Sequence, residues 1–373
     1  MENTQTQGSS RLLSLDVFRG LTIAGMIVVN TPGNDQAYTQ LDHAAWNGCT
    51  MTDLVFPFFL FIAGVSLVFS LSKRMESGRT EGLAPQILRR AAVIFGLGLF
   101  LNAIPNYHPS TIRVLGVLQR IAICYGLTSI IFLKTGLKTQ IGIVAAALLG
   151  YWLAMTYIPV PGFGAGVLTK EGSLASFVDR TLLGAHIYRQ GPYDPEGILS
   201  AVPSMATILL GVFTGLWLRS GRTHRDKIYG MLASGTVLAA AGWLWGIWFP
   251  INKALWTSSY VLYTAGLALW ALSFCYLLIE VKAIKWWSKP FEIYGMNAIV
   301  AYVVPILLLK FMVLTKLAVP GGDPIQLRVW LCDRIFGAWL SPLNASAAFA
   351  FFYTLLWLIP FWFLYKKKIF IKA

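Results

Sequence analysis

The sequence predicts an all-α protein, a polytopic bundle of about ten membrane-spanning helices. Of the 373 residues, 56% are hydrophobic and only 12% are charged, about half the charged share of an average soluble domain. The apolar residues also gather in long blocks, and a helix needs about 20 mainly apolar residues to cross roughly 30 Å of hydrocarbon. Composition and block length together therefore indicate an integral membrane protein.

Ten apolar blocks follow one another along the chain, and we expect each to form one spanning helix. Their approximate limits are 12–30, 53–72, 88–104, 114–133, 140–158, 198–218, 228–249, 258–280, 291–313 and 346–365. A further apolar stretch at 327–340 contains three charged residues, so we expect a surface helix there. Residues 1–10 are expected to form a disordered tail and 11–373 a single membrane domain, because no repeat or linker divides them.

The basic residues follow the predicted topology. A net charge of +14 would suggest a nucleic-acid partner in a soluble protein. If the ten spans alternate, however, 19 of the 30 Lys and Arg residues fall on one side and eight on the other. The positive-inside rule makes the richer side cytoplasmic. We therefore expect cytoplasmic N and C termini and no nucleic-acid partner.

Polar residues in or beside the spans mark candidate functional groups, because they are costly in a membrane. Asn30 closes the first span, Asp53 opens the second, and His43 and Asn47 lie in the loop between them. The same outer half of the bundle contains Gln119, Arg120, Asp194, Glu196, Asn252, Lys253, Trp256 and Ser258. Their common level predicts a site at the outer face.

His43 and Asn30 have the chemistry that acyl transfer to an amine requires. That reaction needs a base or nucleophile, and donors aimed at the developing oxyanion. A loop histidine is more often solvated or structural, so the polar neighbours of His43 decide in its favour. The other three histidines lack such neighbours and are interpreted as surface residues; they are His108, His186 and His224.

Several other polar residues have structural interpretations. Asp16 and Arg19 are three residues apart on one helix and are expected to pair with each other. Arg120 needs a carboxylate or phosphate; Asp53 or Glu196 could supply the former, and a ligand contact is an equal alternative. The four cysteines show no metal-binding spacing, so we expect no metal, although two of them, in outer loops, could pair.

Six segments carry a resemblance to a known family. They are RLLSLDVFRGLTIAGMIVVN (11–30), HAAWNGCTMTDLVFPFFLFIAGVS (43–66), GVLQRIAICY (116–125), DPEGILS (194–200), NKALWTSSYVL (252–262) and YGMNAIVAY (294–302). In this order they resemble the transmembrane heparan-alpha-glucosaminide N-acetyltransferase family and its bacterial relatives. The resemblance implies that acetyl passes from cytosolic acetyl-CoA to the amino group of a glucosamine-type sugar at the periplasmic face of a bacterial inner membrane. It also implies that His43 and Asn30 are the active-site residues.

The remaining site residues are assigned by their place in the bundle. The proposed contacts to the amino sugar are Asn47, Asp53, Arg120, Glu196 and Lys253. The proposed contacts to acetyl-CoA are Arg19, Gln119, Ser258 and Asn297. Because the nucleotide of acetyl-CoA is charged, we expect it to stay at the basic cytoplasmic end. The other partner is the lipid bilayer, and a homodimer is left open.

The main alternative is an amino-sugar transporter without acyl transfer, and a non-catalytic scaffold is a third. Transporters commonly show repeats and interrupted helices that meet at the midplane. The polar residues here gather near one face instead, and the sequence shows no repeat. Tight binding of acetyl-CoA would separate the enzyme from a simple sugar carrier.

Overall fold

The computed structural model describes residues 12–78, 81–104, 108–318 and 323–371, so the predicted tail at 1–10 lies outside the described residues. Helices dominate, as expected. The α-helices are α1 Leu13–Asn30, α2 Met51–Glu76, α3 Leu83–Ala103, α4 Val117–Lys134, α5 Leu137–Tyr157, α6 Leu174–Leu183, α7 Ala201–Arg219, α8 His224–Trp245, α9 Ser258–Tyr276, α10 Lys289–Met296, α11 Ala298–Leu314, α12 Leu327–Cys332 and α13 Pro342–Lys366. Two short antiparallel strands, β1 Lys316–Leu317 and β2 Ile325–Gln326, form a hairpin.

Nine helices within the described ranges are individually long and apolar enough to cross a membrane. The bent pair of α10 and α11 makes a tenth span if it is counted as one, so the structure agrees with the prediction of about ten spans. The stretch predicted as a surface helix contains only the short α12 and one wider helical turn at Asp333–Gly337. The chain is therefore a multi-pass membrane protein.

The prediction of one continuous helix over 291–313 is wrong. The axis bends by 87° between α10 and α11, at Asn297, whose backbone is not helical (φ −122°, ψ 49°). Its amide pairs with the end of the chain instead: Nδ2 donates to the Ile369 carbonyl at 3.1 Å, and Oδ1 accepts from the Ile371 N–H at 2.9 Å. These bonds favour a break because they fix Asn297 to the chain that follows α13.

Glycines bring the central helices into backbone contact. A Cβ added at Gly64 of α2 would lie 1.9 Å from the Ile208 carbonyl oxygen of α7. One added at Gly211 of α7 would lie 2.1 Å from the Phe61 carbonyl oxygen of α2. Close approach of this kind is typical of helix pairs in membranes. Lipid leaves no hydrophobic driving force between helices, so they associate through the close van der Waals packing that small residues allow. The α2–α7 pair is therefore a rigid centre for the bundle.

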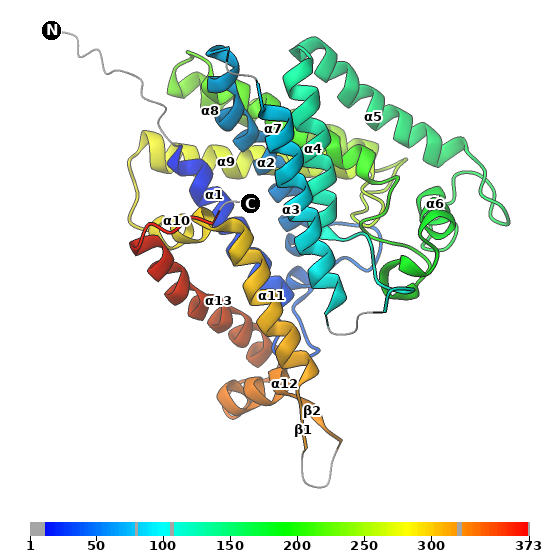
Figure 1. Cartoon of the computed structure of the whole chain (residues 1–373), viewed down its shortest axis with the longest axis vertical. Helices are drawn as coiled ribbons and strands as arrows, with labels where there is room; N and C mark the ends of the chain where they lie inside the picture. Colours follow the sequence, from blue (N-terminus) through cyan, green and yellow to red (C-terminus); the bar gives the residue numbers. More distant parts are fainter. Residues whose placement is uncertain (1–11, 79–80, 105–107, 319–322, 372–373) are drawn as a thin grey trace.

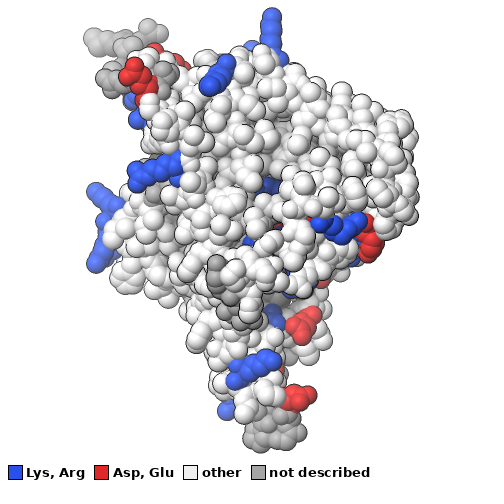
Figure 2. Space-filling model, turned by 45° about the vertical axis from the view of Figure 1, so that its right-hand side comes forward, with Lys and Arg blue, Asp and Glu red and all other residues white. Residues whose placement is uncertain are grey.

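The two ends of the bundle differ in structure. Figure 1 shows the start of α1 together with α10 at the upper left, whereas α6 and the β-hairpin lie to the right and at the bottom. The loop of residues 31–50 joins this second end, which we call the outer end. Figure 2 shows a broad white surface between a left and upper margin, where Lys and Arg groups outnumber a few acidic ones, and mixed acidic and basic groups at its lower right. A surface band without charged groups suits contact with lipid.

The first testable prediction concerns orientation. In a Cys49→Ala background, whose other cysteines are buried, Ala165→Cys lies on the exposed part of the outer loop. Gly221→Cys lies at the opposite end, where an added Cβ has no neighbour within 4 Å. An impermeant thiol reagent added to intact cells should label Ala165→Cys and not Gly221→Cys, because the basic loops stay inside. Labelling of Gly221→Cys alone would reverse the assignment of faces.

Candidate active site

Asp53 joins the outer loop to the start of α2. It is the third residue of that helix and completes a capping box with Thr50. Its Oδ2 accepts hydrogen bonds from the Thr50 N–H at 3.1 Å and the Ala44 N–H at 3.0 Å. A capping box satisfies N–H groups that a helix start leaves without partners. The same carboxylate therefore ends the loop and begins the span, and it is 1% exposed.

His43 is held against the other oxygen of this carboxylate. Its Nδ1 lies 2.7 Å from Asp53 Oδ1, and 54% of the imidazole is exposed. A carboxylate can only accept, so Nδ1 carries the proton in this contact and Nε2 keeps its lone pair. This is the arrangement that orients the histidine of a catalytic triad. His43 can act through Nε2 as a base or a nucleophile.

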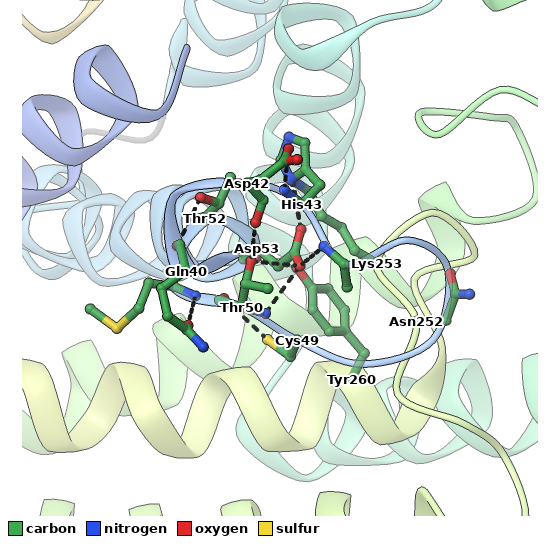
Figure 3. Close-up of polar contacts among 12 residues, drawn as sticks. Gln40, Asp42, His43, Cys49, Thr50, Thr52, Asp53, Asn252, Lys253 and Tyr260 are labelled. Carbon is green, nitrogen blue, oxygen red and sulfur yellow. Dashed lines mark hydrogen bonds and ion pairs between the residues drawn. The ribbon is translucent and has the colours of Figure 1, made fainter. Parts of the chain in front are cut away.

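Lys253 approaches the pair from the connection between α8 and α9 (Figure 3). Its Nζ lies 3.4 Å from Asp53 Oδ1 and 3.1 Å from His43 Nδ1. Because a protonated His43 Nδ1 cannot accept a hydrogen bond, the Lys253 ammonium donates to the Asp53 carboxylate. Burial lowers the pKa of Lys253 below its ordinary value, although Asp53 and Glu196 act in the opposite direction. The next residue back, Asn252, donates to the Asn47 side-chain oxygen at 3.1 Å and so ties this connection to the His43 loop.

Aromatic residues form the floor of the site. The Tyr260 hydroxyl donates to the main-chain oxygen of Asp53 at 2.5 Å and points up at it in Figure 3. Trp256 packs edge-on against both Tyr260 and Phe56, with ring centroids 5.3 and 5.0 Å apart. All three rings are buried. Packing of this kind fixes the position of the Asp53 main chain along the bundle. Tyr260 was not predicted from the sequence, because a tyrosine in an apolar span has no distinctive pattern.

Arg120 is buried and forms no ion pair within the described residues, so of the two alternatives left open for it, the ion pair with Asp53 or Glu196 is not formed. Its Nη2 donates to the Gly197 carbonyl at 3.1 Å and to the Ser200 hydroxyl. Both carboxylates are occupied by basic side chains from loops instead. The Nε and Nη1 groups of Arg120 are buried and have no hydrogen-bond partner among the described residues.

Arg113 is the partner of Glu196, and sequence reasoning did not single it out. Its Nε donates to Asp194 Oδ2 at 3.1 Å, and its Nη2 donates to Asp194 and Glu196. Burial opposes the charge of Arg113, but Glu196 and Asp194 outweigh it and raise the pKa of the guanidinium. The cluster ties the loop before α4 to the loop before α7. The two acidic residues in DPEGILS were the available signal for a basic partner.

The four residues predicted to bind acetyl-CoA do not form one group. Arg19 donates to Asp16 at 3.0 Å, which confirms that pair, and also to Ser66 at 2.7 Å. Ser258 donates to the Leu148 carbonyl at 2.7 Å, and the amide of Asn297 holds the end of the chain. The buried Gln119 has an Nε2 without a partner among the described residues.

Two further expectations can be placed on the structure. Asn30 is the last residue of α1 and is exposed, but no hydrogen bond joins its side chain to another described residue, His43 included. Cys49 and Cys332, the two outer cysteines that could have paired, are free thiols. Over the described part of the chain, no three His, Cys, Asp or Glu side chains form a group that could hold a metal ion.

Fold and site together define a multi-pass helical membrane protein with a carboxylate-oriented histidine at one end of the bundle. A family model described as the catalytic part of heparan-alpha-glucosaminide N-acetyltransferase matches residues 11–248. The chain belongs to this family. The matched segment contains His43, Asp53 and Arg120, whereas Lys253 lies just beyond it.

Two relatives extend the match. The chain is 30% identical over 358 residues to heparan-alpha-glucosaminide N-acetyltransferase of Mus musculus, covering 80% of this chain and 54% of that protein. It is also 30% identical over 356 residues to the Homo sapiens protein of the same name, covering 79% and 52% respectively. The chain thus spans about half the length of the curated relatives it matches.

Asp179 of α6 supplies a prediction on stability. Its carboxyl is 1% exposed and accepts from the Ile198 N–H at 2.8 Å. Burial raises its pKa from 3.8 to about 6, despite that hydrogen bond. Between these values the folded chain keeps a proton that the unfolded chain loses. The free energy of unfolding should therefore fall by about 1.4 kcal/mol for each pH unit across this window, and no further above it.

Asp179→Asn keeps an oxygen acceptor but cannot titrate. Melting temperatures of both proteins in detergent, measured from pH 4 to 8, should differ by an amount that grows in favour of the variant up to about pH 6 and then stays constant. Parallel curves over the whole range would contradict the raised pKa.

Proposed function

We propose that this chain is a membrane-bound acyltransferase that moves acetyl from cytosolic acetyl-CoA to the amino group of a glucosamine-type sugar at the outer face. In the bacterial inner membrane, that face is periplasmic. The observation that carries the proposal is the 2.7 Å contact between His43 Nδ1 and Asp53 Oδ1, which leaves Nε2 in an exposed ring. Membership of an N-acetyltransferase family supports the same chemistry.

In the proposed reaction, Nε2 of His43 takes a proton from the sugar amine as nitrogen attacks the thioester carbonyl. The C–N bond forms, the C–S bond breaks, and the imidazolium returns the proton to the departing CoA thiolate. Asp53 stabilises the imidazolium and holds the ring in place. Direct attack by Nε2, giving an acyl-histidine that the amine then resolves, would use the same atom.

Other polar residues are proposed to bind the reactants. Asn30 would donate its exposed amide to the oxyanion, a contribution typically worth about 10² to 10³ in rate. Lys253, whose Nζ lies 3.1 Å from His43 Nδ1, is proposed to contact the sugar together with Asn47 and Glu196. Arg120 has buried N–H groups without partners among the described residues, and such donors are costly unless an acceptor reaches them. We therefore keep Arg120 as a contact to a substrate oxygen.

The donor contacts are supported to different degrees. Gln119 retains an amide nitrogen that could bind a carbonyl of the pantetheine arm. Arg19 lies toward the end that we predict to be cytoplasmic, where the nucleotide would stay. Ser258 and Asn297 already bond to main-chain groups, so a role for either in binding acetyl-CoA requires those bonds to be shared or broken.

One observation favours the transporter alternative, because the α10–α11 span is broken and transporters use broken helices. The break does not lie at mid-depth, however. The 17 residues of α11 all follow the break, and at 1.5 Å per residue they form about 25 Å of helix. Incubation of purified protein with labelled acetyl-CoA and a panel of amino sugars tests the two functions directly: acetylated sugar supports the enzyme, and uptake by vesicles without acetylation supports the transporter.

His43→Ala should abolish acetyl transfer and leave binding of acetyl-CoA largely intact, because the imidazole acts at the thioester and does not anchor the nucleotide. Transfer of labelled acetyl and equilibrium binding of acetyl-CoA are measured on the same preparation. His108→Ala is the matched control, since His108 is an exposed histidine of another outer loop. Wild-type turnover by a monodisperse His43→Ala protein would remove His43 from the mechanism.

Asp53→Asn should lower turnover by at least about 10², because an amide can present its NH₂ group to Nδ1 and favour the wrong tautomer; the same change in a serine protease costs about 10⁴. The substitution also weakens the cap of α2. Asp226→Asn controls for that loss, since Asp226 completes the equivalent capping box of α8 without contacting the site. Equal activity of the two variants would mean that Asp53 serves only as a cap.

A further inference from the structure

Residues 367–371 fold back against the broken span. α13 ends at Lys366, and the chain then reverses at Lys368, whose φ of 56° is in the left-handed region. Beyond it, Asn297 holds Ile369 and Ile371 through its amide. Non-glycine residues adopt such a φ at a cost and are usually held there by surrounding contacts. The two hydrogen bonds to Asn297 are such contacts.

This reversal borders a cavity of about 390 Å³ that is open to the surface and lies between residues 365–370 and the end of α10. Its lining combines two ammonium groups, a phenol and two apolar side chains, from Met296, Tyr365, Lys366, Lys368 and Phe370. The lining of the cavity is thus both basic and apolar.

The charge around this cavity is strongly positive. Lys289 lies over the Tyr365 ring at 4.0 Å and pairs with Glu292 at 3.1 Å. Glu292 also accepts from the Tyr365 hydroxyl at 3.0 Å, so the nearby carboxylate is fully engaged. Lys366 is stacked 5.0 Å from the centre of the Trp362 ring, and Lys368 forms no ion pair within the described residues.

The surroundings place the cavity where hydrocarbon meets water. Three lysines, 366–368, stand at the end of the membrane-spanning α13, and the first of them is its last residue. Three exposed apolar residues come next, Ile369, Phe370 and Ile371. Lysines and tryptophans at a span end are typical of the headgroup level, and basic residues on the cytoplasmic side attract anionic lipids.

We infer that this cavity binds one anionic glycerophospholipid, with Lys366 and Lys368 on the headgroup phosphate and Phe370 and Met296 along the first acyl carbons. The nucleotide of the proposed donor also has phosphates, but it has no acyl chain for the apolar lining and the exposed tail. A zwitterionic lipid brings its own cation and gains less from two lysines. The inference concerns a lipid and does not depend on the proposed function.

The test uses full-length protein in phosphatidylcholine nanodiscs. Native mass spectrometry would follow titration with dioctanoyl phosphatidylglycerol, dioctanoyl phosphatidylcholine, and adenosine 3′,5′-bisphosphate as a nucleotide probe. The double variant Lys366→Gln/Lys368→Gln should weaken phosphatidylglycerol binding by roughly 25-fold, since each lysine near an anionic surface contributes about fivefold. Binding of phosphatidylcholine should not change.

Two further variants sharpen the result. Lys134→Gln/Lys138→Gln removes two exposed lysines where α4 ends and α5 begins, at the same end of the bundle, and should leave phosphatidylglycerol binding at the wild-type level. Phe370→Ser keeps all charges and should weaken it severalfold. Equal losses in both lysine pairs, or none in either, would overturn the site. So would lysine-dependent binding of the bisphosphate without binding of phosphatidylglycerol.

Discussion

The carboxylate of Asp53 is the interaction on which the outer end of this protein depends. It caps α2, anchors the loop that contains His43, and accepts a hydrogen bond from the imidazole N–H. Lys253, from the connection between α8 and α9, balances the charge of this carboxylate. Its own height is set by Tyr260 from below. Because one buried group performs these tasks together, the position of the histidine follows from how α2 begins. Loop conformation and chemistry are therefore not separable here.

A second constraint is that buried polar groups in lipid must find partners inside the protein. Most do so in an orderly way: Arg19 with Asp16, Arg113 with two carboxylates, and Asn297 with the end of the chain. Arg120 and Gln119 are among the exceptions, because each keeps a buried N–H group that no described residue meets. Arg120 lies over the ring of Trp256 at 5.2 Å, and its unmet donors are the reason that we propose it as a substrate contact.

The sequence predicted the architecture well because membrane helices are set by length and apolarity, which a single chain displays directly. It also brought His43, Asp53 and Lys253 to one face, since polar residues at span ends stand out. It could not assign their partners: Asp53 was expected to meet sugar or arginine, and the contact with His43 depends on a ten-residue loop fold. The break at Asn297 was equally hidden, because it depends on bonds to residues more than 70 positions later.

The direct backbone contact between α2 and α7 limits which sequence changes this family can tolerate. Where backbones touch at Gly64 and Gly211, no side chain is available to absorb an insertion or a larger residue, so any such change must displace a whole helix. Asp53 sits on the outer end of the displaced helix and would move with it. Substitutions deep in the bundle can therefore damage the chemistry as surely as substitutions in the site, and sequence drift should be slowest along this seam as well as around the histidine.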